Sequence, residues 1–272
     1  MSKQERAALA KKHVEELEKS AAWDIHMSQV YTLFYGGPNG NPVNTLKKCN
    51  TEMKIKLEGC DTVTALLNVS KENPGKVAIL NFASYKNPGG GYLKGSFAQE
   101  EALCSESTLY PVLAKFEHTY YDWNREHLNH ALYTNRALYS PEIIFKRDNK
   151  EVVTNVITCA APNYYGAGRQ GISYEENIKA LTSRVKFMYD VAEDNSIDTL
   201  ILGAWGCGVF RQDAYKVAEL LIKEAVDRSF SQVIFAVPNN NRNDNYYYFS
   251  QVLEAYNNNS SEYEEMISMD VF

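Results

Sequence analysis

The stretch KVAILNFASYKNPGGG, residues 76 to 91, does most to decide the expected fold. Its first nine residues are mainly apolar and β-branched, a pattern typical of a short strand buried within a sheet. The three glycines that follow give up side-chain contacts and cost backbone entropy. We therefore expect a buried strand that ends in a loop where the bare backbone is needed.

Strands and helices alternate along the rest of the chain. We expect further strands at 52–59, 152–163, 197–205 and 231–239, and helices at 3–20, 61–73, 99–110, 173–195, 211–230 and 246–256. Pro111 should bend or end the helix that begins at Gln99, and Ser173 with Glu176 forms a capping box. Residues 117 to 150 are rich in aromatics and turns and yield no clear assignment. This alternation predicts a three-layer α/β fold with a largely parallel sheet.

Composition indicates one domain, residues 1–272, with an N-terminal helical extension over residues 1–50 packed on it. The net charge of −6 argues against charge-driven binding to nucleic acid or to an anionic membrane. Nothing resembles a signal peptide or a membrane span, so we expect an intracellular, cytoplasmic monomer, or a nuclear one in a eukaryote. Five scattered cysteines without metal-ligand spacing are interpreted as reduced thiols, and no metal or cofactor is expected.

The loops after the predicted strands carry the unusual residues. In open α/β sheets a ligand binds beyond the carboxyl ends of the strands, where backbone N–H groups point outward. GAWGCGVF, residues 203 to 210, follows one strand and could wrap a diphosphate, or could be an ordinary tight turn. GAGRQG, residues 166 to 171, matches the dinucleotide fingerprint, but four residues separate it from its strand, so a flexible loop is favoured over a nicotinamide site. These junctions indicate an anionic, nucleotide-like ligand.

Two adjacent acids, Glu100 and Glu101, follow the triple glycine in QEE at residues 99 to 101. Carboxylates at a helix start could serve the helix dipole alone. That explanation leaves the triple glycine and the polar Gln99 without a reason. Neighbouring helical residues point about 100° apart, so both acids should not aim at one atom. We expect one acid to hold a hydroxyl and the other to act at the bond that is cleaved.

NPGGG, a seven-residue spacer and QEE together resemble the signature of poly(ADP-ribose) glycohydrolases of the microbial type, which are built on a macrodomain. NFASYKNPGGG, VITCAAPN and GAWGCGVFRQD resemble the same family, and the similarity covers about residues 75 to 237. The resemblance implies a macrodomain-like α/β/α fold with a mixed, largely parallel sheet. It also implies hydrolysis of the ribosyl O-glycosidic bond of poly(ADP-ribose) or of related conjugates, which releases ADP-ribose.

Carried onto this sequence, the resemblance implies a catalytic pair in which Glu101 is the general acid and base and Glu100 orients the ribose. It implies binding roles for the residues around them, with Asn81 the weakest candidate: Asn81, Asn87, Gly89, Gly90, Gly91, Gln99, Gly206, Cys207, Gly208, Val209 and Phe210. The glycine N–H groups would approach the diphosphate, and Phe210 would pack over a ribose. The chemistry fits, because an oxocarbenium-like transition state needs an acid for the leaving oxygen and negative charge near the sugar.

Two other functions remain open from the sequence. A macrodomain that binds ADP-ribose without cleaving it would share the fold, although such a module has no need of paired acids. A hydrolase of mono-ADP-ribosylated protein or nucleic acid would share the motif and differ only in the bond it cleaves. The expected partners are ADP-ribose, poly(ADP-ribose) and ADP-ribosylated macromolecules.

Overall fold

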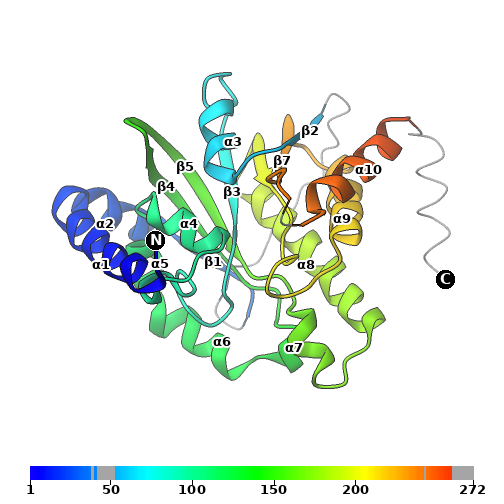
Figure 1. The fold of residues 1–272 in the computed structure, drawn as a ribbon, viewed down its shortest axis with the longest axis horizontal. Helices are drawn as coiled ribbons and strands as arrows, with labels where there is room; N and C mark the ends of the chain where they lie inside the picture. Colours follow the sequence, from blue (N-terminus) through cyan, green and yellow to red (C-terminus); the bar gives the residue numbers. More distant parts are fainter. Residues whose placement is uncertain (38–39, 42–52, 242, 259–272) are drawn as a thin grey trace.

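One sheet runs through the centre of the computed structural model, which describes residues 1–37, 40–41, 53–241 and 243–258 (Figure 1). Within these residues the strand order is β1-β4-β5-β3-β6-β7-β2, with β5, β3, β6, β7 and β2 parallel and β1 and β4 antiparallel at one edge. The strands are β1 (Leu33–Tyr35), β2 (Lys54–Glu58), β3 (Val77–Phe82), β4 (Ala137–Arg147), β5 (Lys150–Cys159), β6 (Thr199–Leu202) and β7 (Gln232–Ala236).

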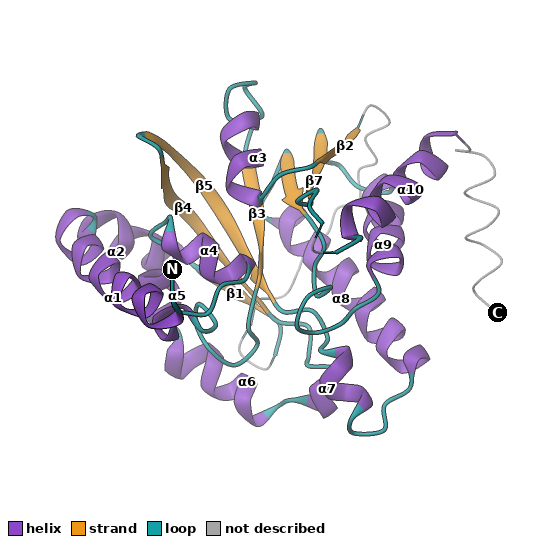
Figure 2. Cartoon of the chain, viewed as in Figure 1, coloured by secondary structure: helices purple, strands orange, loops and turns teal. Residues whose placement is uncertain are grey.

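Helices cover both faces of this sheet, as Figure 2 shows. One face carries α8, α9 and α10, and the other carries α3, α4 and α5, with α1 and α2 beside them. The predicted three-layer α/β/α class with a mixed, largely parallel sheet is confirmed. The helices are α1 (Lys3–Ser20), α2 (Ala22–Tyr31), α3 (Thr62–Val69), α4 (Gln99–Ser105), α5 (Leu109–Ala114), α6 (Asp122–Glu126), α7 (Tyr164–Gly168), α8 (Tyr174–Asp194), α9 (Ala214–Val226) and α10 (Asn245–Asn258), with short turns η1 (Tyr92–Lys94), η2 (Glu117–Tyr121) and η3 (Asn129–Ala131).

The central strand β3 divides the core into two. Ala78 and Leu80 point to the side of α8 and α9, whereas Ile79 points to the side of α3 and α4. All three side chains are completely buried, as expected for a parallel strand covered on both faces. Asn81 continues the alternation toward α4, so the end of this strand delivers a polar side chain to the first acid of QEE.

The uncertain region between 117 and 150 contains β4, an eleven-residue strand that the sequence did not reveal. Its pairing with β5 shifts register between Ser140 and Ile143, and Glu142 has a positive φ of 56°. The bulge interrupts the two-residue alternation that marks a strand, and Pro141 further disguises it. The strand β1 was also missed, and α2 lies within the expected helical extension, where no bounds were predicted for it. Residues 33–35, predicted within a helical extension, instead pair with β4.

Two local expectations need correction. The helix predicted at 99–110 ends at Ser105, before the proline, and Pro111 lies in the first turn of α5, where a missing N–H costs no hydrogen bond. The stretch GAGRQG, residues 166–171, was expected to be a flexible loop, but its first three residues belong to the short helix α7, with the Asn163 side chain accepting from the Gly166 N–H at 2.9 Å. The capping box of Ser173 and Glu176 at the start of α8 is confirmed.

No helix in the described part of the chain is long and apolar enough to cross a membrane. Cys60, Cys104, Cys159 and Cys207 carry free thiols, and Cys49 lies outside the described residues. Burial raises the pKa of the Cys159 thiol to about 12. A buried thiol of this kind stays protonated and unreactive at neutral pH.

Candidate active site

Two cavities open near the carboxyl ends of the parallel strands. The larger, about 540 Å³, runs from the loop after β6 past the start of α4 to the start of α3. The smaller, about 300 Å³, lies between α1 and the segment that joins the triple glycine to α4. Phe97, whose side chain is 69% exposed, lines both of them. The two cavities therefore meet at the residue that leads into QEE.

Glu101 is held by the backbone at the start of α4. One carboxylate oxygen accepts a hydrogen bond from the Gly91 N–H at 2.8 Å, and the other accepts from the Ala98 N–H at 2.9 Å. The second bond is the reach of an N3 glutamate back to the N-cap, as helix-end chemistry predicts. The first bond is not helix-end chemistry, because it ties the acid to the triple glycine. Glu101 lines the smaller cavity.

Glu100 is more deeply buried than its neighbour. Its carboxylate accepts from the Asn81 side-chain amide at 3.2 Å and from the Ser84 N–H at 2.7 Å. Burial, with a smaller contribution from the charge of Glu101, raises the pKa of Glu100 to about 8, against the opposing effect of these hydrogen bonds. Glu100 is consequently a neutral acid over much of the physiological pH range, beside a second carboxyl group.

Asn81 and Gln99 fasten α4 to β3. Asn81 is fully buried and also donates to the Thr158 hydroxyl at 3.2 Å. Gln99 accepts from the Phe82 N–H at 2.8 Å and donates to the Leu80 carbonyl at 2.9 Å, so its amide binds the backbone of β3 as a neighbouring strand would. These two side chains set the position of QEE relative to the sheet.

The triple glycine leaves room for the two acids. A Cβ on Gly90 would lie 2.6 Å from a Glu101 oxygen and 2.8 Å from a Glu100 oxygen, and the residue has a φ of +59°. The two carboxylates thus approach one point, although the helical spacing predicted divergence. The N–H groups of Gly90 and Gly91 are bonded to Asn87 and Glu101 within the protein. The sequence had suggested that these N–H groups approach a diphosphate, but both already have partners within the protein.

The loop after β6 offers the unused N–H groups instead. Within the described residues, no hydrogen bond uses the N–H groups of Gly208, Val209 or Phe210. Gly208 is open to solvent on its side-chain face, and Val209 is 79% exposed. Consecutive free N–H groups at the end of a buried strand form a concavity suited to an anion.

Buried polar contacts fix the shape of this loop. Gln212 and Asn177 exchange two amide hydrogen bonds of 2.9 Å, and Gln212 also donates to the Pro162 carbonyl at 2.8 Å. The indole N–H of Trp205 donates to the Cys159 carbonyl at 3.1 Å. Loop 203–213 is therefore anchored to the ends of β5 and α8. Phe210 packs edge-on against Tyr133, with ring centres 6.0 Å apart.

The predicted site residues all lie near the same edge of the sheet, but only some of them line a cavity. Gln99, Gly206, Gly208, Val209 and Phe210 line the larger cavity, and Glu101 lines the smaller one. The others do not line either cavity. Asn81 and Glu100 lie behind the wall, Gly89 is buried, Gly90 and Gly91 frame the acids, Asn87 is exposed, and the Cys207 N–H bonds the Ala204 carbonyl.

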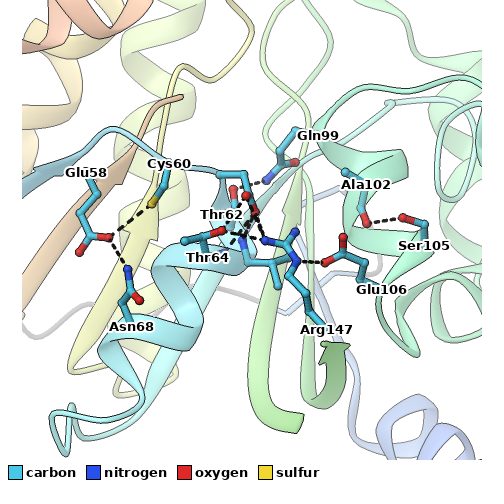
Figure 3. A network of polar contacts seen from close by, with 12 residues as sticks. Glu58, Cys60, Thr62, Thr64, Asn68, Gln99, Ala102, Ser105, Glu106 and Arg147 are labelled. Carbon is cyan, nitrogen blue, oxygen red and sulfur yellow. Dashed lines mark hydrogen bonds and ion pairs between the residues drawn. The ribbon is translucent and has the colours of Figure 1, made fainter. Parts of the chain in front are cut away.

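Sequence reasoning missed the far end of the larger cavity, where α3, α4 and β4 meet (Figure 3). Arg147 donates to Asp61 at 3.0 Å, to Glu106 at 2.7 Å and to the Thr64 hydroxyl at 2.8 Å. Partial burial opposes ionisation of Asp61, but hydrogen bonds from Thr64 and the charge of Arg147 outweigh it and lower the pKa of Asp61. The sequence signal that could have indicated this end of the cavity was Asp61, an aspartate at a helix N-cap shortly after the strand β2.

Metal chemistry has no evident ligand set in the described ranges, because no three His, Cys, Asp or Glu side chains cluster suitably there. The donors available at the site are backbone N–H groups, amides and two carboxyl groups. Such a set fits a neutral or anionic organic ligand and acid–base chemistry.

Comparisons with known proteins agree with this geometry. The family described as microbial-type PARG, catalytic domain, matches residues 2–148. The poly(ADP-ribose) glycohydrolase of Thermomonospora curvata, bound to the inhibitor ADP-HPD, has 27% sequence identity and a TM-score of 0.79, over 91% of this chain and 99% of that chain. The enzyme of Deinococcus radiodurans in complex with ADP-ribose has 31% identity and a TM-score of 0.77, over 85% and 97% of the two chains. A comparison with curated protein sequences found no match. The resemblance drawn from NPGGG and QEE is confirmed, and the chain belongs to the microbial-type poly(ADP-ribose) glycohydrolase family.

Proposed function

We propose that this chain hydrolyses the ribosyl O-glycosidic bond of poly(ADP-ribose) and releases ADP-ribose, with Glu101 as general acid and base. One observation carries the assignment of the acid. Glu101 is oriented by two backbone N–H groups and lines a cavity, whereas Glu100 is sealed behind the wall. The family and the solved relatives support the reaction, and the geometry supports the choice of residue.

In the proposed reaction Glu101 gives its proton to the leaving oxygen as the bond from that oxygen to the ribose C1″ breaks. The positive charge that develops on the sugar is stabilised by nearby negative charge, including the substrate's own diphosphate. Glu101, now a carboxylate, then accepts a proton from the water that adds to C1″. General acid catalysis of this kind contributes about 10²–10⁴-fold to the rate, so positioning must supply the remainder.

The rest of the site binds and positions the ADP-ribose unit. We assign the diphosphate to the free N–H groups of loop 203–213, with Phe210 packing on the adjoining ribose. Asn87 is assigned to the hydroxyl groups of the ribose that is cleaved, and Glu100 to orienting that ribose from behind the wall, on the side of Gly90 that both carboxylates approach. The proposal keeps a single domain over residues 1–272, acting as an intracellular, cytoplasmic monomer.

A product analysis tests the function directly. The protein is incubated in parallel with poly(ADP-ribose), mono-ADP-ribosylated protein and ADP-ribosylated DNA, and released ADP-ribose is quantified. The proposal expects release from the polymer at the highest kcat/KM. Release only from a mono-ADP-ribosylated substrate would support the alternative hydrolase, and tight ADP-ribose binding without any release would support a binding module.

A further inference from the structure

The smaller cavity is lined by Glu101 and by no residue of loop 203–213, to which the diphosphate is assigned. We call it the α1 cavity, because one wall is a face of α1 that includes Arg6, Leu9, Lys12 and His13. The opposite wall is formed by residues between Tyr92 and Ser105, with Glu101 among them. Its volume of about 300 Å³ is at the lower end of the range for small-molecule sites. It is large enough for part of a nucleotide.

Specific contacts hold α1 against this second wall. The Arg6 Nε donates to the Gly95 carbonyl at 2.8 Å, and the His13 Nδ1 shares a hydrogen bond with the Tyr92 hydroxyl at 2.7 Å. Gly95 has a φ of +72°, and a Cβ there would lie 2.0 Å from the Lys3 carbonyl oxygen, so only glycine allows this close approach. The α1 cavity is consequently a defined part of the fold, placed by the segment that also carries Glu101.

The reaction requires space on both sides of the acid. If the larger cavity holds the ADP-ribose that is released, the group attached to C1″ must lie beyond Glu101. Phe97 is the largely exposed aromatic residue at the rim of both cavities, in position to contact substrate where it passes from one to the other. We propose that the α1 cavity is the acceptor subsite, which receives the nucleotide end of the next unit of poly(ADP-ribose). This inference rests on the proposed function and names the leaving group of that same site.

The side chains of the α1 cavity fit this occupant. Leu9, which is 53% exposed, and Phe97 offer apolar surface for a purine or ribose. Lys12 is paired with Glu16 at 3.4 Å, and both side chains are well exposed, so the pair is weak and Lys12 can turn to a phosphate. A single amino-acid side chain as leaving group would use little of this surface. The cavity therefore favours a polymer over a mono-ADP-ribosylated protein.

Two substrates separate this role from a structural one. We compare kcat/KM for poly(ADP-ribose) with kcat/KM for 1″-O-methyl ADP-ribose, whose leaving group is too small to enter the α1 cavity. Lys12→Glu reverses the charge, and Leu9→Trp fills the space. Lys11→Glu and Ala8→Trp make the same changes at exposed positions of α1 that do not line the cavity. The ratio of kcat/KM for poly(ADP-ribose) to kcat/KM for the methyl compound should fall at least tenfold in the two cavity variants. It should stay within twofold of the wild-type ratio in the two controls.

Binding to the inactive Glu101→Gln protein gives a readout that does not need turnover. Di(ADP-ribose) should bind at least tenfold more tightly than ADP-ribose, and Lys12→Glu should remove that gain while leaving the affinity for ADP-ribose unchanged. Equal affinity for the two ligands, or an unchanged ratio of kcat/KM in both cavity variants, would overturn the acceptor subsite. If the wild type cleaves neither substrate while the dimer still binds more tightly, the reaction is wrong and the subsite stands.

Discussion

The Gly91 N–H donates to the Glu101 carboxylate at 2.8 Å, which joins the last residue of the triple glycine to the last residue of QEE. The two halves of the sequence motif are thus bonded directly to one another. Their spacing reflects the length of chain needed to turn through η1 and enter α4. A change on either side of this bond should disturb the acid.

Glu101→Gln should keep ADP-ribose binding and lose turnover. The amide has nearly the same shape but cannot protonate the leaving oxygen, so kcat should fall by about 10²–10⁴-fold. Isothermal titration with ADP-ribose and single-turnover hydrolysis measure the two properties. Glu126→Gln, at an exposed position of α6, is the matched control. A Glu101→Gln rate within threefold of the wild type would show that another group is the acid.

Gly90→Ala should impair both the site and the fold. The added Cβ would collide with Glu100 and Glu101, and alanine at a φ of +59° costs about 1–2 kcal/mol. We expect at least a tenfold loss in kcat/KM together with a lower urea midpoint. Gly168→Ala is the control, because its Cβ would meet nothing within 4 Å and the residue lies in α7. Wild-type kinetics in Gly90→Ala would mean that the carboxylates can move aside freely.

The raised pKa of Glu100 gives the fold a pH dependence. An acid whose pKa is about 8 in the folded protein and near its usual value when unfolded stays protonated only in the native state between those values. Its contribution to the free energy of unfolding is complete below the unfolded pKa. The contribution is lost as the pH rises toward 8, by about 1.4 kcal/mol for each pH unit. Glu100→Gln removes this ionisation. Urea denaturation at pH 5, 6.5 and 8 should show a steeper fall for the wild type, and parallel profiles would contradict the burial argument.

Gln212→Ala should loosen the proposed diphosphate loop. It leaves the buried amide of Asn177 and the Pro162 carbonyl without their partner, at a cost of about 1–3 kcal/mol. ADP-ribose affinity should fall further than stability alone requires, because loop 203–213 loses its anchor. Calorimetry and urea denaturation on the same sample give both numbers. Gln251→Ala, on the exposed side of α10, serves as control.

Arg228→Met should destabilise the protein without changing the chemistry. Arg228 is fully buried and pairs with Asp190 and Glu193 at 2.6 Å each, and with Glu224. Removing it leaves three acids uncompensated, which costs about 3–5 kcal/mol in comparable buried pairs. A lower melting temperature with normal kcat per folded molecule is expected. A normal melting temperature would indicate that water already screens this cluster.

The sequence was sufficient for the strands of the parallel core. Runs such as 76–84 and 197–205 are mainly apolar, and parallel strands buried on both faces have this composition. The capping box at Ser173 was equally legible, because its geometry is local. By contrast, β4 depends on pairing with β5 and contains a bulge, so its alternation could not be read along the chain. Antiparallel edge elements were therefore the hardest part of the fold to foresee.

The same distinction between local and long-range features holds for the candidate site. The sequence proposed Glu101 and loop 203–213 as candidates, because each lies within a continuous stretch of sequence that resembles the family. The sequence could not show that the glycine N–H groups form hydrogen bonds within the protein, because the acceptor for Gly91 lies ten residues further along the chain. The helix α1 was predicted, but its place at the smaller cavity was not foreseen, nor was Arg147 at the larger one. Both reach these cavities only through the folded chain, from a helix and a strand with no motif of their own.

Alternate side chains of β3 pack into the core and Asn81 binds Glu100, so the position of Glu100 depends on the register of this strand. One inserted or deleted residue within Val77–Asn81 would turn Asn81 toward α8 and α9, bury an amide among apolar side chains, and deprive Glu100 of its donor. The fold therefore constrains the length of this strand independently of side-chain identity. The turn at Asp148–Asn149, which joins β4 to β5 and carries no side chain of the site, is where the chain can lengthen at low cost.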